Sequence, residues 1–413
     1  MPVLHLLSEL YFPEETSTGY YVTNIAEAVA EIPDWQVGVI CAQPTYSKRG
    51  IVAAKQEKRN GVTIHRCWST RFNKNHLPGK VLNWATFAWS VTLRCLRQFR
   101  RGDLVLVVTN PPLLPWIVVV CSKIKGSVPV LLVHDLYPDV LVPTGILRSE
   151  RMLYRLLDRM QTRVFLSFRS IIVLGRDMKK RICAKDPRLE AKIQVIPNWT
   201  DPDEIPFRDR ECNPVREKLG LADEFVVQFS GNLGRSHGID DLLEAARVLR
   251  DEPIHFLVFG WGAARDSIES GVAKGGLEKV HLLDPCRREE LGVYLNACDL
   301  FLFPFRKGMS GISVPSRLYN VIAAGNPVIA VTDDDSELAL IVREQRIGSV
   351  IEPGDTEELA NKILFYSQNR ELLEPMRIRA RDAAVNRYSM DQILSVYQDY
   401  FIELASRFPP SSF

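Results

Sequence analysis

Apolar and polar positions follow two patterns along this chain, short apolar runs and longer stretches with helical spacing. In the first half the short runs predict strands at Val3–Ser8, Gln36–Cys41, Val62–Arg66, Leu104–Thr109, Val130–His134, Ser170–Val173 and Ile193–Ile196. The longer stretches predict helices at Thr18–Ile32, Val81–Arg100, Ser149–Phe168 and Arg176–Ala184. Such alternation is typical of βαβ units around a parallel sheet.

The alternation begins again after a polar segment, Asn198 to Asn213, that is rich in Pro, Asp and Glu and predicts a linker. Strands are then predicted at Phe225–Ser230, His255–Phe259, Val280–Leu283, Leu300–Phe303, Pro327–Val331 and Gly348–Ile351. Helices are predicted at Asp240–Arg250, Arg287–Ala297, Ser316–Ala324, Ser336–Glu344 and Thr356–Ser367, followed by a helical tail from about Glu371 to Ser406.

The whole pattern predicts an α/β protein with two doubly wound, Rossmann-like domains. We place the first at 1–198 and the second at 199–385, with a helical tail at 386–413 that packs toward the first domain. Ligands of such sheets bind beyond the carboxyl ends of the strands. We therefore expect the two sheets to face each other across a ligand-binding cleft.

The net charge of +2 conceals an asymmetry between the halves. Residues 1–200 contain 28 Lys and Arg against 15 Asp and Glu, and the remainder contains 24 against 35. A basic half suits an anionic membrane surface or nucleic acid. Equally, the two halves could attract each other, or the charges could simply be solvated.

The cysteines and the apolar segments indicate a cytoplasmic protein. Eight cysteines are scattered without Cys-x-x-Cys pairs or zinc spacing, which suits buried thiols in a reducing compartment. The N-terminus lacks the basic start of a signal peptide. Prolines interrupt the most apolar stretch, Leu104 to Cys121, so no transmembrane helix is predicted.

A glycine-containing loop follows the predicted strand Phe225–Ser230. Gly231, Gly234 and Gly238 precede a helix that opens with Asp240-Asp241. Small residues let backbone N–H groups approach an anion, and a helix N-terminus adds partial positive charge. Arg235 would add a charged fork for phosphate. An ordinary strand-to-helix turn would have the same composition.

A second loop of this kind runs from Arg306 to the helix that starts at Pro315-Ser316 and ends at Gly325. Ser316 and Arg317 lie in the predicted first turn, where anions bind. A capped connecting helix is the alternative. Two such loops in one domain favour an anion site.

With these loops the sequence resembles glycosyltransferase family 4, which has the GT-B fold, and within it the branch that builds bacterial surface polysaccharides. The resemblance rests on Ser-Gly-Asn-Leu-Gly-Arg at 230–235, Val-Pro-Ser-Arg-Leu-Tyr at 314–319 and Ala-Ala-Gly-Asn-Pro-Val-Ile-Ala at 323–330. Further matches are Phe12-Pro13 to Gly19, His134-Asp135-Leu-Tyr-Pro138, Val195 to Trp199, Phe259 to Gly262 and Ala297 to Asp299.

The resemblance implies a retaining transfer of a hexosyl or acetamidohexosyl group from a nucleotide sugar, commonly a UDP-sugar, to a glycan or lipid-linked acceptor. It also implies which residues form the site. By this resemblance the candidate catalytic residues are His134 and Asp135, of which His134 would contact the donor sugar. The donor diphosphate would meet Gly19, Gly231, Asn232, Leu233, Gly234, Arg235, Ser316 and Arg317. Ser310, Gly311, Ile312 and Ser313 would form the donor-sugar loop, and Asn320, Gly260 and Leu283 would meet the ribose or base.

No metal or other cofactor is expected, because backbone amides and basic side chains can stabilise a departing diphosphate. Asp333-Asp334-Asp335 superficially resembles the metal-binding Asp-x-Asp of another transferase fold. Since it lies between a predicted strand and a helix, we interpret it as a loop and N-cap.

The sequence departs from the family pattern around the donor. Asn232 and His237 stand where relatives carry an Arg/Lys pair, and Ile312 and Asn320 stand at the two glutamates of the Glu-x7-Glu motif. Arg235, Arg317 and backbone amides would then carry more of the donor binding. Gly19 lacks the additional glycines that many relatives have in the loop after the first strand.

A basic and aromatic stretch in the first half bears on the acceptor. It comprises Trp68, Arg71, Phe72, Lys74, His76, Lys80, Trp84, Phe87 and Trp89. It could lie on the inner face of the membrane and meet a lipid-diphosphate acceptor, or its aromatics could pack on the sheet. No nucleic-acid partner is expected.

The sequence leaves two other functions open. One is a nucleotide-sugar epimerase of GT-B-like fold. The other is a non-catalytic subunit that binds a nucleotide sugar, which the missing glutamates make plausible.

Overall fold

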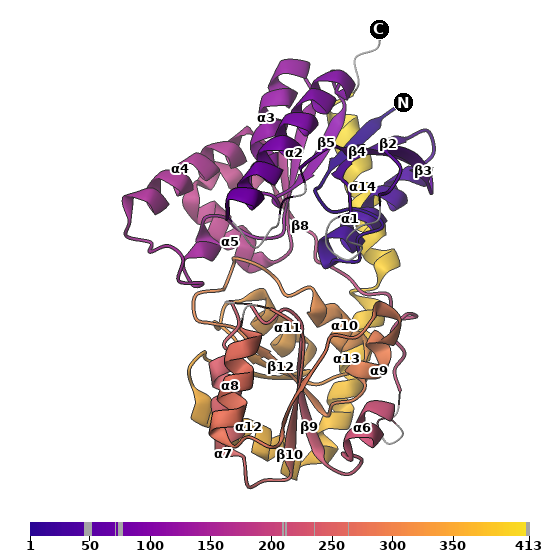
Figure 1. The fold of residues 1–413 in the computed structure, drawn as a ribbon. Helices are drawn as coiled ribbons and strands as arrows, with labels where there is room; N and C mark the ends of the chain where they lie inside the picture. The colour runs from indigo at the N-terminus through magenta and orange to yellow at the C-terminus, as the bar shows by residue number, and fades with distance from the viewer. Residues whose placement is uncertain are drawn as a thin grey trace. The chain divides into compact units, whose positions relative to one another are not determined.

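The computed structural model describes residues 1–44, 52–70, 72, 77–208, 210, 213–234, 236–262 and 264–409. These residues form two compact units. Unit 1 comprises Met1–Asp139, Ser149–Pro197 and Asp391–Phe413, and unit 2 comprises Val140–Arg148 and Asn198–Met390. Figure 1 shows both units as a ribbon that is coloured from the N-terminus to the C-terminus.

These bounds differ from the predicted domains at two places. The segment 140–148 belongs to unit 2, because Val140 packs against that unit's core. The chain returns to unit 1 only after Met390, because Thr200 N–H donates to Tyr388 O (2.9 Å) and Met390 N–H donates to Thr200 O (2.8 Å). The predicted boundary at 385 is therefore too early.

The described residues of unit 1 form an eight-stranded sheet of order β3-β4-β2-β1-β5-β6-β7-β8, parallel except for β3. Its strands are β1 Val3–Leu7, β2 Gln36–Ala42, β3 Gln56–Arg59, β4 Val62–Cys67, β5 Leu104–Val108, β6 Val128–Val133, β7 Ser170–Val173 and β8 Ile193–Val195. Its helices are α1 Ser17–Ala30, α2 Leu77–Gln98, α3 Leu114–Lys125, α4 Met152–Ser167, α5 Arg176–Lys185 and α14 Met390–Arg407. Strands β5 and β6 are buried along their whole length, as expected for apolar runs covered by helices on both faces.

The direction of each crossover assigns the helices to the two faces of this sheet. The connection from β1 to β2 runs one way along the sheet, and those containing α2 to α5 run the other way. Because βαβ crossovers are right-handed, α1 covers one face and α2 to α5 cover the opposite one. Helix α14 joins α1, since Gln398 Nε2 donates to Ala28 O (2.7 Å). Figure 1 shows α1 and α14 together on one side of the sheet.

Unit 2 holds a six-stranded parallel sheet of order β11-β10-β9-β12-β13-β14 in its described part. The strands are β9 Phe225–Ser230, β10 Ile254–Phe259, β11 Val280–Leu283, β12 Leu300–Pro304, β13 Val328–Val331 and β14 Gly348–Ile351. The helices are α6 Pro214–Leu219, α7 Ile239–Val248, α8 Arg265–Gly275, α9 Leu291–Leu295, α10 Arg317–Ala323, α11 Glu337–Gln345, α12 Thr356–Gln368 and α13 Leu373–Asn386. Two apolar clusters, one on each face, bury the sheet.

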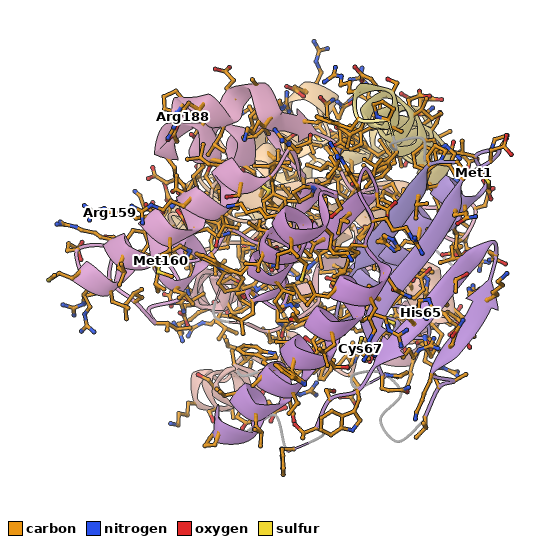
Figure 2. All side chains as sticks on the ribbon, turned by 90° about the horizontal axis from the view of Figure 1, so that it is seen from above. Met1, His65, Cys67, Arg159, Met160 and Arg188 are labelled. Carbon is orange, nitrogen blue, oxygen red and sulfur yellow. The ribbon has the colours of Figure 1, made fainter. Side chains whose placement is uncertain are left out.

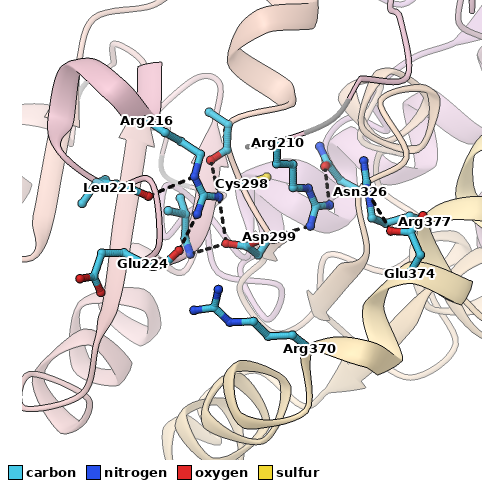
Figure 3. Close-up of polar contacts among 12 residues, drawn as sticks. Arg210, Arg216, Leu221, Glu224, Cys298, Asp299, Asn326, Arg370, Glu374 and Arg377 are labelled. Carbon is cyan, nitrogen blue, oxygen red and sulfur yellow. Dashed lines mark hydrogen bonds and ion pairs between the residues drawn. The ribbon is translucent and has the colours of Figure 1, made fainter. Parts of the chain in front are cut away.

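A buried ion network fixes the amino edge of this sheet. Asp299, just before β12, accepts from Arg216 Nη1 (3.0 Å), Arg210 Nη1 (3.4 Å) and Val226 N (2.8 Å) (Figure 3). Burial lowers the pKa of Arg210, and the Asp299 carboxylate opposes that shift. Because the network lies at the strand ends away from the ligand edge, it is a structural element that joins α6 to the sheet.

Candidate functional site

The strand order of unit 2 marks its ligand-binding edge. From β9 the chain proceeds through β10 to β11 on one side, and then continues from β12 on the other side of β9. The connections after β9 and β12 therefore diverge at a topological switch point, where open α/β sheets bind ligands. Both anion-binding loops predicted from the sequence, at 231–238 and 305–316, lie at this point.

The loop after β9 is bonded to the loop after β10. Gly231 N–H donates to Phe259 O (2.9 Å), and Leu233 N–H donates to Trp261 O (2.9 Å). The Leu233 carbonyl accepts from Ala264 N–H (3.1 Å). Gly260 has a φ of +149°, and a Cβ there would collide with Gly231 O, so only glycine fits.

The backbone N–H groups of this loop fall into two groups, those that already donate within the protein and those that do not. The N–H groups of Gly231 and Leu233 already donate within the protein, so a contact of these two residues with the diphosphate must use other atoms and stays a prediction. Within the described part of the chain, the N–H groups of Asn232 and Gly234 have no protein partner. Among the described residues 231–234, these are the N–H donors that remain for an anion.

Arg317 brings a guanidinium to the same loop. It is the first residue of α10, and its Nη1 donates to Ser230 O at the end of β9. A Cβ on Gly231 would occupy the position of this guanidinium, which explains the glycine at φ +140°. Arg317 makes no ion pair with a carboxylate in the described residues, and burial lowers its pKa to about 10. The group is therefore a charged, uncompensated fork that retains unused N–H donors.

His237 holds this guanidinium from the other side. Its Nε2 lies 3.2 Å from Arg317 Nη2, and its ring stacks on Phe305 with the centroids 5.2 Å apart. Because Arg317 can only donate, Nε2 must accept, and Nδ1–H is left to face Ser236 Oγ at 3.4 Å. Burial, followed by the Arg317 charge, lowers the pKa of His237 to about 3. The imidazole is therefore neutral at physiological pH.

The loop after β12 is braced by the aspartates that follow β13. Asp333 accepts from the N–H groups of Gly308 (2.9 Å) and Ser310 (2.9 Å), and Asp335 accepts from Ser310 Oγ (2.8 Å). The N-cap of α11 is Ser336, whose Oγ accepts from Ala339 N–H. The interpretation of Asp333-Asp334-Asp335 as a loop fits this geometry, although the cap itself is the next residue. The described residues contain no group of three or more His, Cys, Asp or Glu side chains that could hold a metal.

Some backbone N–H groups of the predicted donor-sugar loop, at 310–313, already have hydrogen-bond partners within the protein. Ile312 is fully buried in the core, and its N–H donates to Met309 O (3.1 Å). The Ser310 N–H is bonded to Asp333 as well, so two amides of this loop already have partners within the protein. Gly311 has a φ of +69°, and Ser313 follows two positions later in the chain. The roles of Gly311, Ser313 and Ser316 stay predictions.

The residues predicted to meet the ribose or base lie at the same edge, but they already have bonds. Asn320 Oδ1 accepts from Thr200 Oγ1 (3.1 Å). Gly260 N–H donates to Leu283 O (3.2 Å), and Arg265 Nη1 donates to Gly260 O (2.6 Å). Any contact of Gly260 or Leu283 with a nucleoside must therefore use another atom of these residues.

In unit 1, His134 and Asp135 follow β6 at the carboxyl edge of the sheet. Their N–H groups both donate to Thr109 Oγ1, at 3.2 and 3.3 Å, which joins this loop to the end of β5. His134 Nε2 is buried and has no hydrogen-bond partner among the described residues. Burial lowers the pKa of His134 to about 4 and raises that of Asp135 to about 6. No sequence signal points to Thr109, whose role depends on the adjacency of β5 and β6.

Gly19 has a local structural reason that the sequence did not show. It lies in the first turn of α1, not in the loop before it, and its N–H donates to the N-cap Thr16 Oγ1 (3.2 Å). A Cβ at Gly19 would lie 2.6 Å from Glu14 O. The Gly19 N–H is therefore already bonded, and the contact of Gly19 with a diphosphate stays a prediction.

Several predicted residues lie outside the described ones, namely Arg235, Arg71, Lys74, His76 and the Lys80 side chain. The aromatic residues of the basic and aromatic stretch at 68–89 differ in burial. Some fit packing on the sheet, and others fit contact with a membrane. Phe87 is buried, whereas Trp68, Phe72 and Trp89 are exposed. Packing on the sheet therefore accounts for only part of the stretch.

Comparison with known proteins assigns the family. Residues 17–199 match the glycosyl transferase 4-like domain, and residues 213–383 match glycosyl transferases group 1. The probable glycosyltransferase WbjE of Pseudomonas aeruginosa is 34% identical over 71% of this chain and 73% of its own length. The chain belongs to the glycosyltransferases. The putative colanic acid biosynthesis glycosyl transferase WcaI of Escherichia coli K12 is 24% identical over 84% of this chain and 88% of its own.

Solved structures show the fold of this glycosyltransferase. Sucrose-phosphate synthase from Thermosynechococcus elongatus matches 98% of this chain and 100% of its own with a TM-score of 0.78 at 17% identity. Anabaena HepE in complex with UDP and glucose matches the same shares with a TM-score of 0.74 at 17% identity. The fold is GT-B, as predicted. None of the described helices is long and apolar enough to cross a membrane.

Proposed function

We propose that this glycosyltransferase moves a sugar from a UDP-sugar to a glycan or lipid-linked acceptor, with retention of the anomeric configuration, in bacterial surface-polysaccharide synthesis. The observation that carries the proposal is the Arg317 guanidinium held against Gly231 at the switch point of unit 2. The names of the relatives support the pathway, since one is named a putative colanic acid biosynthesis glycosyl transferase. The UDP-glucose complex of HepE supports the donor class.

The proposed chemistry needs negative charge stabilised on the departing diphosphate. The bond from the anomeric carbon to the β-phosphate oxygen breaks, and its electron pair leaves with UDP. Arg317 and the N–H groups of Asn232 and Gly234 are positioned to bind that charge. The acceptor oxygen then bonds to the anomeric carbon from the same face, and its proton passes to the departing phosphate. Arg235 remains a proposed additional phosphate ligand.

His134 and Asp135 are proposed to contact the donor sugar. Their pKa shifts favour a neutral imidazole and a carboxyl group that titrates near pH 6. A neutral His134 can accept or donate one hydrogen bond with a sugar hydroxyl without adding charge. We propose no metal, because the diphosphate charge is met by Arg317 and backbone donors. Addition of EDTA should leave the turnover unchanged.

Features of the first unit support our proposals for the acceptor and the location. The seven cysteines that the structure describes are all free, which supports a reducing cytoplasm. The exposed Trp68, Phe72 and Trp89 support contact of unit 1 with the inner face of the membrane, where a lipid-linked acceptor would lie. No observation supports the epimerase alternative.

A donor panel tests the proposal directly. The protein is heated with UDP, GDP and their sugars, and a bound ligand raises the unfolding temperature in proportion to ln(1 + [L]/Kd). The stabilising UDP-sugar is then incubated with lipid-extract acceptors, and released UDP and the anomeric configuration of the product are measured. We expect UDP release and retention. A changed sugar without UDP release would instead indicate an epimerase, and binding without either reaction would indicate a non-catalytic subunit.

A further inference from the structure

Asp139 is a buried carboxylate in the loop that follows β6 in unit 1. It lies four positions after Asp135, and only 2% of the residue is exposed. Arg181 Nε (2.9 Å) and Tyr154 OH (3.4 Å) donate to its Oδ1, and Lys185 Nζ donates to its Oδ2 (2.8 Å). Burial and then the Asp139 charge raise the pKa of Tyr154 to about 12, so its hydroxyl keeps the proton that it donates. A buried carboxylate is costly unless charged and hydrogen-bonding partners replace its water, and these donors do so.

Two helices supply these donors. Tyr154 and Asp158 lie one turn apart on α4 and project from the same face. Arg181 and Lys185 have the same spacing on α5, and Lys185 also pairs with Asp158, which joins the two helices. The next residue of α4, Arg159, lies on the outer side of that helix (Figure 2). We call the carboxylate and its partners the Asp139 anchor, which comprises Asp139, Tyr154, Asp158, Arg181 and Lys185.

The Asp139 anchor fixes one end of the loop that carries the two candidate catalytic residues. At the other end, the N–H groups of His134 and Asp135 both donate to Thr109 Oγ1, at 3.2 and 3.3 Å. Between the two attachments Leu136 is fully buried. A loop that is held at both ends places its side chains more narrowly than a loop held at one end, since each attachment removes conformational freedom. Loss of the Asp139 carboxylate would leave this loop attached mainly at Thr109.

The anchor also lies where the chain leaves unit 1. Asp139 is the last residue before the segment 140–148, which belongs to unit 2, and the chain returns to unit 1 just before α4. Val140 packs against the core of unit 2. Because Tyr154 lies in the first turn of α4, its bond to Asp139 joins the exit of this segment to its return. The anchor therefore keeps the loop after β6 fixed to unit 1, although the residues that follow it belong to the other unit.

We propose that Asp139 is a positioning residue for sugar transfer, which holds His134 and Asp135 in the geometry that the donor sugar requires. Because its carboxylate is buried and already bonded to three donors, it acts through the loop backbone and not by contact with a substrate. Positioning of this kind matters because groups that contact a reacting substrate must be held within a fraction of an ångström. The inference rests on the proposed function for the roles of His134 and Asp135, whereas the anchoring of the loop does not.

Unit 2 contains a matched control. Asp299 is also buried and accepts from Arg216, Arg210 and a backbone N–H, but it lies at the amino edge of its sheet, away from the ligand edge. Asp139→Ala and Asp299→Ala therefore remove the same kind of network, and only the first affects the loop after β6. Because unpaired charges remain in both variants, each unfolding temperature should fall by about 5 to 10 °C.

Hydrogen exchange measures the anchoring without any substrate. The readout is the exchange rate of the His134 and Asp135 amides, which donate to Thr109 Oγ1 in the closed loop. Asp139→Ala should raise both rates on the order of 10-fold, because the loop then opens locally at lower cost. Asp299→Ala should leave them within about twofold of wild type, since it destabilises a different unit.

Kinetics measure the positioning itself. Steady-state UDP release is followed with the stabilising UDP-sugar, well below every unfolding temperature. Asp139→Ala should lower kcat by roughly 10- to 100-fold through misplaced sugar contacts, whereas Asp299→Ala should keep kcat within about twofold of wild type. The Kd of UDP should stay within about twofold in both variants, because the diphosphate donors belong to unit 2 and are distant from the anchor. Asp139→Asn keeps an oxygen that can accept from Arg181, so it should recover part of the lost kcat.

A milder pair of variants covers the case in which Asp139→Ala does not fold. Lys185→Met removes one donor and leaves Asp139 with Arg181 and Tyr154. It should lower kcat by roughly threefold, about the value of one hydrogen bond. Arg210→Met removes one donor from Asp299 in the same way and should leave kcat unchanged.

Equal losses of kcat in Asp139→Ala and Asp299→Ala would overturn the proposal, because the effect would then be one of stability alone. Unchanged exchange of the His134 and Asp135 amides in Asp139→Ala would overturn it too, as would a loss of UDP affinity as large as the loss of kcat. If exchange follows the prediction but wild type releases UDP from no nucleotide sugar, the proposed function fails and the anchoring of the loop stands. If wild type turns over its donor and Asp139→Ala does so at the rate of the control, only the positioning role fails.

Discussion

The carboxyl edges of the two sheets carry different chemistry at equivalent places in the fold. In unit 2 the switch point holds Arg317, whose guanidinium has no carboxylate partner among the described residues, beside the neutral His237. In unit 1 the edge holds His134 and Asp135, both shifted by burial toward their neutral forms. One edge suits the binding of a diphosphate, and the other suits hydroxyl contacts with a sugar.

The cationic ligand edge does not lie in the half of the chain that has the positive net charge. The cationic site lies in the half with 24 Lys and Arg against 35 Asp and Glu, whereas the basic half carries its excess on α2 to α5. Total charge therefore located an outer surface and not the ligand site. A few groups held without counter-charge decide the local potential, because neighbouring ion pairs on the surface largely cancel and are screened.

The largest effect is expected from Arg317. Arg317→Ala removes the guanidinium that the structure places at the loop after β9, and Arg317→Lys keeps the charge but loses the fork. We expect kcat/KM to fall by roughly 100- to 1,000-fold for Ala, as for other donors that stabilise a leaving group. Steady-state release of UDP measures it.

Arg235→Ala is the matched comparison. The sequence analysis expects Arg235 and Arg317 to supply the positive charge that relatives take from an Arg/Lys pair. If Arg235→Ala costs more than Arg317→Ala, the assignment of the phosphate charge to Arg317 is wrong. If both leave donor affinity and turnover untouched, the proposed donor site fails altogether.

The sequence predicted the fold far better than the individual contacts. Strong apolar periodicity located most strands and helices within a few residues. The polar edge strand β3 and the helices α3, α6 and α8 were not predicted. The residues 140–148 joined unit 2 through tertiary packing that no local pattern encodes.

The candidate site shows the same limit at the level of single atoms. Motif position brought Gly231, Leu233 and Arg317 to one edge, as expected for strand ends of a parallel sheet. It could not show that the N–H groups of Leu233 and Ile312 are consumed by Trp261 and Met309, because such partners come from distant or folded-back backbone. His237 was visible only as a missing lysine, and its bond to Arg317 required the structure.

The second prediction concerns Asp135 in unit 1. The folded protein keeps this carboxyl protonated up to about pH 6, whereas the unfolded chain loses the proton near pH 4. Stability should therefore fall between pH 4 and pH 6 and remain at the lower level above pH 6. Asp135→Asn should remove that fall and raise the unfolding temperature at pH 7.5, while turnover drops by about 100-fold if the carboxyl contacts the sugar.

The two readouts of this variant separate a catalytic from a structural role. Melting curves at pH 4 and pH 7.5 provide the stability comparison, and UDP release provides the activity. Full turnover in Asp135→Asn would exclude a role in the reaction. A lower unfolding temperature at pH 7.5 would show that the carboxyl is stabilised by a partner and not merely buried.

The smallest effect is expected from His237, which positions Arg317. Removal of the accepting Nε2 in His237→Phe keeps the stack on Phe305 but frees one side of the guanidinium. Donor affinity should therefore fall by roughly threefold to tenfold, which corresponds to about 1 kcal/mol, the net value of a typical hydrogen bond. His237→Gln offers an amide oxygen in place of Nε2 and should recover much of the loss. Because the pKa of His237 is lowered to about 3, protonation should not affect donor binding between pH 5 and pH 8. Titration calorimetry with the UDP-sugar across this range measures both points. A wild-type inflection near pH 6.5 that His237→Gln abolishes would mean that the histidine is solvated and charged, and that the guanidinium is held by the Ser230 carbonyl alone.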